Sequence, residues 1–220
     1  MENPKIYAVL TGDLIGSSKF EKKQRSDIIA LLKGSFSKVP REIVASPFVI
    51  YRGDSFQGVI SMPEEAVRAA VLIRTGLISK FKGKKARLDA RISIGLGSID
   101  YLPPGDRAGE GDGEAFRRSG MELDRIKKGE QNLIIKTPWE DVNEELMTEL
   151  ALLDALVQRW TKEQAEAILY QLQGATQEDI AKILKITQPA VFQRLSIAGY
   201  RAVQAALDRY KTILQYKITT

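Results

Sequence analysis

Two short apolar runs, each leading to a Gly-Asp pair, are the features that most constrain how this chain folds. Residues 6–10 lead to Gly12-Asp13, and residues 48–51 lead to Gly53-Asp54. Glycine lets the backbone turn and leaves room for a close neighbour, whereas an acid at the end of a buried strand is costly unless a cation neutralises it. If adjacent strands bring the two acids together, they form a site for a hard divalent cation and the phosphates it carries. Taken singly, each acid also fits an ordinary turn.

The order of the strand and helix patterns up to residue 139 predicts an α+β domain. Helix patterns cover 24–39, 64–81 and 114–128, and strand patterns cover 6–10, 48–52, 55–61, 89–98 and 133–136. This β-α-β-β-α-β order with an added α-β pair is that of a ferredoxin-like or palm-like domain. Right-handed crossovers then place the first strand beside the hairpin, so we expect Asp13 and Asp54 close together at one edge of the sheet.

The residue types that are missing narrow the chemistry. The 220 residues include no Cys and no His, which excludes disulfides, thiol nucleophiles, imidazole bases and zinc sites built from them. Carboxylate-held metals remain, so Mg²⁺ or Mn²⁺ is the expected cofactor, with no zinc, haem or flavin. No run reaches the ~18 apolar residues of a membrane span, and the N-terminal residues lack a signal-peptide pattern. We therefore expect a cytoplasmic protein with no membrane contact.

After this first domain, 1–139, the pattern is helical throughout. An apolar stripe from Leu146 to Trp160 predicts a linker helix over 140–160, which packs against the first domain or forms a dimer seam. Residues 161–220 predict an all-α helix-turn-helix domain, and the net charge of +5 indicates an anionic partner. The N-cap positions of its first three helices are Thr161, Thr176 and Thr187.

The stretch 176–195 resembles the helix-turn-helix of sigma-factor region four and related bacterial regulators. The resemblance implies that a helix beginning at Gln188 enters the major groove of double-stranded DNA, where Gln188 and Gln193 read bases. A helix-turn-helix that contacts only protein is the alternative. The DNA-binding residues expected from the resemblance are Thr176, Gln177, Lys182, Lys185, Gln188, Ala190, Gln193 and Arg194, with Lys182, Lys185 and Arg194 on phosphates.

Four stretches of the first domain, 8–18, 52–57, 91–97 and 113–120, together resemble the SatD family of bacterial proteins. More distantly, the layout is similar to the catalytic domain of class III nucleotidyl cyclases, where two aspartates hold two metal ions on a nucleoside triphosphate. The resemblance implies that Asp13 and Asp54 are metal ligands. It also implies that the backbone of Leu14-Ile15-Gly16-Ser17 cradles phosphates at the start of a helix.

The sequence departs from the cyclase pattern at positions that matter for catalysis. Ile50 stands where cyclases have a purine-reading lysine. Ala115 and Ser119 align with the asparagine and arginine that steady the cyclase transition state, and Arg117 and Arg118 are the nearby candidates to replace the lost charge.

Three functions fit these observations. The favoured one is a DNA-binding regulatory protein whose cyclase-like domain binds a nucleotide and a divalent metal ion. The second is a metal-dependent nucleotidyl cyclase or nucleotidyltransferase that uses Asp13 and Asp54. The third is a non-catalytic, homodimeric interaction protein. If Arg91 and Arg52 pair internally with the two aspartates, the acid pair is structural and needs no metal.

Overall fold

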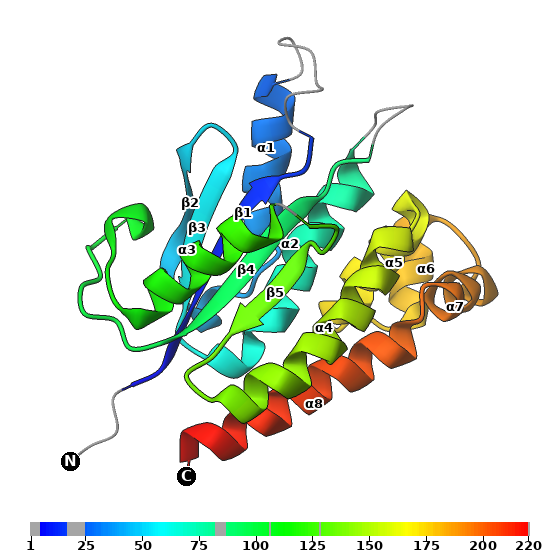
Figure 1. The fold of residues 1–220 in the computed structure, drawn as a ribbon. Helices are drawn as coiled ribbons and strands as arrows, with labels where there is room; N and C mark the ends of the chain where they lie inside the picture. Colours follow the sequence, from blue (N-terminus) through cyan, green and yellow to red (C-terminus); the bar gives the residue numbers. More distant parts are fainter. Residues whose placement is uncertain (1–4, 17–24, 82–86, 106, 128, 220) are drawn as a thin grey trace.

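The computed structural model describes residues 5–16, 25–81, 87–105, 107–127 and 129–219, which form a mixed α+β fold around a five-stranded sheet (Figure 1). The order β2-β3-β1-β4-β5 is antiparallel except for β5, which pairs parallel to β4. The first strand therefore lies beside the hairpin, as predicted from right-handed crossovers. The strands are β1 (Tyr7–Leu14), β2 (Val44–Arg52), β3 (Ser55–Ile60), β4 (Ala90–Gly97) and β5 (Leu133–Lys136).

Helices cover both faces of the sheet, because alternate strand residues point to opposite sides. Ala8 and Leu10 belong to the cluster with α1 (Arg25–Phe36) and α2 (Ala66–Lys80), whereas Val9 packs with α3 (Glu114–Ile126) on the other face. Three short 3₁₀ helices complete this part of the chain: η3 (Arg41–Ile43), η4 (Pro63–Glu65) and η5 (Ala108–Glu110).

The C-terminal part of the chain is entirely helical, and its helices begin at the predicted caps. Thr161 and Thr176 form capping boxes, and the Thr187 side chain accepts the N–H of Ala190. In the described part of the chain, no helix is both long and apolar enough to cross a bilayer. The helices are α4 (Glu140–Arg159), α5 (Lys162–Leu172), α6 (Gln177–Leu184), α7 (Gln188–Ile197) and α8 (Tyr200–Thr219).

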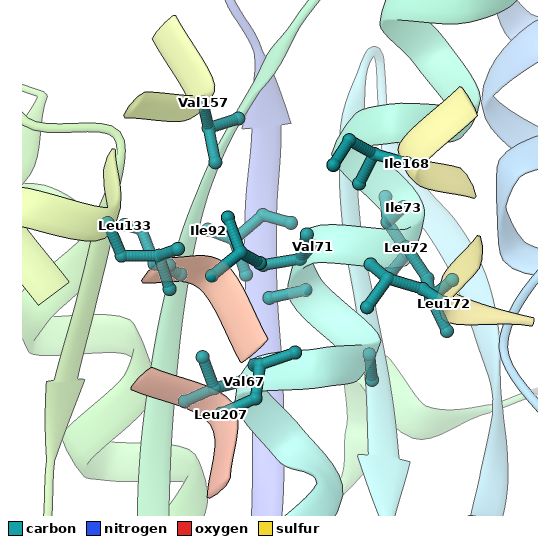
Figure 2. Close-up of a cluster of buried hydrophobic side chains, with 14 of the residues drawn as sticks. Val67, Val71, Leu72, Ile73, Ile92, Leu133, Val157, Ile168, Leu172 and Leu207 are labelled. Carbon is teal, nitrogen blue, oxygen red and sulfur yellow. The ribbon is translucent and has the colours of Figure 1, made fainter. Parts of the chain in front are cut away.

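Helix α2 lies at the centre of the molecule, between the sheet and the C-terminal helices (Figure 1). The sequence predicts an amphipathic helix here, but 13 of its 15 residues are buried. The second face is covered because α5 packs directly against it. Figure 2 shows Val71 and Leu72 of α2 between Ile92 of the sheet and Ile168 and Leu172 of α5.

The apolar stripe on α4 is buried within the same chain. Leu146, Leu150, Leu153 and Val157 are all shielded from solvent, because α4 packs against β5 and α8. This agrees with packing against the first domain, the first of the two interpretations. One continuous apolar cluster runs from the sheet through α2 to the C-terminal helices, and the division into separate domains stays a prediction.

A buried ion cluster fastens α2 to its neighbours. The fully buried Arg74 donates to both carboxylate oxygens of Asp89, each at 2.9 Å, and to Oδ1 of Asp154 on α4 at 2.6 Å. Burial alone would lower the pKa of Arg74, but attraction to Asp89 and Asp154 outweighs burial and raises it. Arg87 also binds Asp89 and donates to the Val157 carbonyl near the end of α4.

Replacing the buried arginine tests this cluster. Arg74→Met leaves the buried Asp154 carboxylate without its cation and leaves Asp89 with Arg87 alone, so we expect the free energy of unfolding to fall by about 3–5 kcal/mol, measured by urea denaturation. The control is Arg209→Met, which breaks an exposed pair with Glu145 and should cost less than about 1 kcal/mol. Equal losses in the two variants would contradict this assignment.

Candidate nucleotide and metal site

The strand register brings Asp13 and Asp54 to the same end of neighbouring strands. Asp13 is the penultimate residue of β1, where it pairs with Arg91 of β4. Gly12 pairs with Phe56 of β3, and Asp54 lies in the turn two residues before Phe56. The two carboxylates interact electrostatically, because the charge of Asp54 contributes to raising the pKa of Asp13.

The two glycines next to these acids have different tasks. A Cβ on Gly12 would lie 2.5 Å from the Phe56 ring and 2.6 Å from the Arg91 carbonyl oxygen, so no larger residue fits between β3 and β4. Gly53 has φ +62, in the left-handed region that the hairpin turn requires. Gly12 thus allows β3 and β4 to pack closely around β1 just before Asp13, and Gly53 allows the hairpin to turn just before Asp54.

Asp13 is a buried carboxylate with incomplete compensation. The residue is 8% exposed, and its Oδ1 and Oδ2 lie 3.4 Å from Arg91 Nη1 and 3.7 Å from Lys127 Nζ. Burial raises the pKa of Asp13 and outweighs these two cations, which lower it. The Arg91 pairing is the one expected if the acids are structural, whereas Lys127 was not anticipated from the sequence.

An aromatic side chain borders the same patch. Tyr51, on β2, is 50% exposed. Partial burial raises the pKa of its hydroxyl, the charge of Lys127 opposes this rise, and the charge of Asp13 reinforces it. Tyr51 therefore lies within electrostatic reach of both Asp13 and Lys127.

The two carboxylates suit a metal ion whose other ligands are water and phosphate oxygens. Within the described ranges, no group of three or more Asp, Glu, His or Cys side chains is placed to hold a metal ion. Asp13 and Asp54 supply two hard oxygen donors, and the remaining positions would fall to water and phosphate oxygens. Mg²⁺ is commonly held in this way, by one or two carboxylates plus substrate phosphates.

The predicted phosphate cradle is only partly available. Leu14 is buried and ends β1 opposite Ala90, and the Ile15 N–H donates to the Asp89 carbonyl at 2.9 Å. Gly16 has φ +68, while Ser17 lies outside the described residues. A phosphate role for this segment stays a prediction.

The positions aligned with the cyclase transition-state residues lie on the buried face of α3. Ala115 and Ser119 are both 0% exposed. Ser119 Oγ shares a 2.9 Å hydrogen bond with Thr11 Oγ1, which also accepts from Gln57 Nε2 at 2.7 Å. Ser93 Oγ donates to the Ser119 carbonyl. This polar chain fixes α3 on the sheet and leaves Ser119 no free contact with a ligand.

Arg117 and Arg118 do not replace the missing charge beside Asp13. They lie near the first turn of α3, where Arg117 pairs with Asp112 and Arg118 donates to the Leu96 carbonyl. Asp13 is paired instead with Lys127, directly after the other end of the helix. Arg117 and Arg118 precede Lys127 by 10 and 9 residues, which corresponds to roughly 15 Å along the helix axis.

The candidate DNA residues surround the turn between α6 and α7. Gln188 Nε2 donates to Gln177 Oε1 at 2.7 Å, which links the first turns of the two helices. Lys185 ends α6 with φ 54. Phe192 is 53% exposed. The eight candidates differ in exposure to solvent. Those that are exposed are Thr176, Lys182, Lys185, Gln188 and Gln193, and those that are partly buried are Gln177, Ala190 and Arg194.

The chain matches no known protein-family profile and no curated protein, so the SatD resemblance stays a prediction. Several solved structures are similar in part, among them the following three. The active GGEEF domain of a diguanylate cyclase from Vibrio cholerae is 16% identical, over 60% of this chain and 83% of that one, with a TM-score of 0.42. The guanylyl cyclase domain of the RhoGC fusion protein from Blastocladiella emersonii is 20% identical, over 53% of this chain and 74% of that one, with a TM-score of 0.40. An adenylate/guanylate cyclase/hydrolase from Silicibacter pomeroyi is 18% identical, over 67% of this chain and 82% of that one, with a TM-score of 0.45.

The left-handed residue between α6 and α7 gives a direct test of the turn. Lys185→Gly removes the steric cost of φ 54, so we expect the free energy of unfolding to rise by about 0.5–1 kcal/mol, measured by urea denaturation. The matched control, Lys182→Gly within α6, should lower it by about 1 kcal/mol. A loss of stability in Lys185→Gly would mean that the turn has another backbone conformation.

Proposed function

We propose that the sheet end bearing Asp13 and Asp54 binds the phosphates of a nucleotide through Mg²⁺ or Mn²⁺. The observation that carries this proposal is the buried Asp13 carboxylate, which lies at the same end of neighbouring strands as Asp54 and whose pKa is raised by burial despite Arg91 and Lys127. A divalent cation shared by the two carboxylates would compensate both charges.

The surroundings favour a nucleotide over a free metal ion. Arg91 and Lys127 supply positive charge for phosphate oxygens once a metal ion takes over the carboxylates. The half-exposed ring of Tyr51 gives a base an aromatic surface beside the same patch. Two carboxylates alone would hold Mg²⁺ weakly, so metal and phosphates are expected to bind together.

Catalysis is the narrower form of this proposal. A nucleotidyl cyclase or nucleotidyltransferase would use Asp13 and Asp54 as metal ligands, with Arg91 and Lys127 as the side-chain cations nearest the reacting phosphates. Ala115 and Ser119 are buried and make no such contribution. Binding without turnover, as in a sensor, therefore fits the residues at least as well as an enzyme does.

Thermal unfolding with nucleoside triphosphates tests binding. A triphosphate with MnCl₂ should raise the unfolding temperature by roughly 5 °C at saturating concentration, more than either component alone. Asp13→Asn and Asp54→Asn should lose this rise. Glu42→Gln should retain it, because Glu42 is an exposed carboxylate just before β2, at the opposite end of that strand.

The same mixtures, with radiolabelled triphosphate, show whether binding leads to turnover. Product that forms with the unaltered protein and is lost in Asp13→Asn would establish the enzyme. Stabilisation without product would establish a sensor. If no triphosphate with Mg²⁺ or Mn²⁺ shifts the unfolding temperature, the proposed function is wrong.

A second function, DNA binding, is supported by a different observation. Helices α6 and α7 are joined by a short left-handed turn, and α7 presents Gln188 and Gln193 to solvent. These are side chains that can pair with adenine in the major groove. The net charge of +5 favours an anionic partner.

Selection from randomised double-stranded oligonucleotides, followed by fluorescence anisotropy, tests this second function. Affinity for the enriched sequence should fall at least tenfold in Gln188→Ala/Gln193→Ala and should decrease with added salt. Gln215→Ala, an exposed position on α8, should bind as the unaltered protein does. No enrichment, or equal affinity of the double variant, would exclude this interface.

A further inference from the structure

Both carboxylate oxygens of Asp13 are engaged by side-chain cations. Oδ1 lies 3.4 Å from Arg91 Nη1, and Oδ2 lies 3.7 Å from Lys127 Nζ. These are long separations for charged hydrogen bonds, which are typically ~2.7–2.9 Å. A metal ion bound by Asp13 needs the same oxygens, so the side-chain cations and the metal ion compete for one carboxylate.

Lys127 is the cation better placed to leave. It follows the last turn of α3, its side chain is 38% exposed, and its Nζ also lies 3.4 Å from Asp124. Arg91 is held on β4, directly across the register from Asp13, and is 24% exposed. A lysine ammonium on a flexible stem has more freedom to change partners than a guanidinium fixed within a strand.

We propose that Lys127 is a placeholder cation, which neutralises Asp13 before the metal ion arrives and then turns to the phosphates of the incoming nucleotide. This inference rests on the proposed metal–nucleotide function. Arg91 and Lys127 partly neutralise Asp13, and the charge of Asp54 acts on the same carboxylate. A divalent ion adds two positive charges to the site, and the negative charge of a triphosphate exceeds them. The Lys127 ammonium that the metal ion displaces is therefore attracted to the phosphate oxygens and is not repelled from the site.

A placeholder has effects of opposite sign on the two ligands. Removing Lys127 takes away a competitor for Asp13, so the affinity for Mn²⁺ alone should rise. The same change takes away a phosphate partner, so the affinity for a triphosphate in saturating Mn²⁺ should fall. A purely structural lysine would not produce this reversal, and neither would a lysine that only contacts phosphate.

The experiment compares the full-length protein with Lys127→Met, Lys127→Arg and the control Lys136→Met, whose lysine pairs with Glu140. Free Mn²⁺ is titrated by electron paramagnetic resonance, and ATP binding is measured by calorimetry at saturating Mn²⁺. Lys127→Met should bind Mn²⁺ about threefold more tightly and ATP about tenfold more weakly. Lys136→Met should retain the affinities of the unaltered protein. Lys127→Arg keeps the positive charge on a group with less freedom to change partners, so its two affinities should lie between those of Lys127→Met and the unaltered protein.

The outcomes separate the inference from the function on which it rests. If the unaltered protein binds neither Mn²⁺ nor Mn²⁺ with ATP, the proposed function and the placeholder both fail. If it binds both, but Lys127→Met leaves Mn²⁺ affinity unchanged or weaker, the placeholder is wrong and the site stands. Thermal unfolding of each variant verifies that it is folded, and Lys127→Gln gives the same comparison if Lys127→Met is not.

Discussion

The buried guanidinium of Arg74 is the interaction on which the rest of the structure depends. It joins α2 to Asp89, just before β4, and to Asp154 on α4, which lies 80 residues further along the chain than Arg74. Such buried ion pairs contribute little net stability compared with apolar packing, but they tolerate few alternative arrangements. The Asp89 backbone extends this order to the candidate site, because its carbonyl accepts the N–H of Ile15, two residues after Asp13.

What the sequence predicted correctly was encoded locally. The place of the first strand beside the hairpin followed from the order of short patterns, and the three threonine caps appeared where cap chemistry placed them. Gly53 could also be interpreted by itself, since its left-handed φ meets a need of its own turn. Such features depend on residues close along the chain or on a topology with few alternatives.

What the sequence did not predict depends on contacts between distant residues. The all-round burial of α2 arises only when α5 covers its second face. Lys127 reaches Asp13 because α3 runs back along the sheet, so that its end meets the end of β1. Arg117 and Arg118 were considered as replacements for the missing charge because they are close to Ser119 along the chain. The direction of α3 places its C-terminal end, and not these two arginines, next to Asp13. Residue type and spacing carry no information on which end of a helix meets which strand.

The polar chain between α3 and the sheet also limits how this part of the molecule can move. Thr11, Gln57, Ser93 and Ser119 satisfy one another in a single alignment of helix and sheet, and sliding α3 by one residue would leave several of them unsatisfied in an apolar layer. These hydrogen bonds thus hold α3 at one position along the sheet. We therefore expect α3 to respond to a ligand bound at its C-terminal end by rotation about side-chain bonds, which is fast and requires no rearrangement of the backbone.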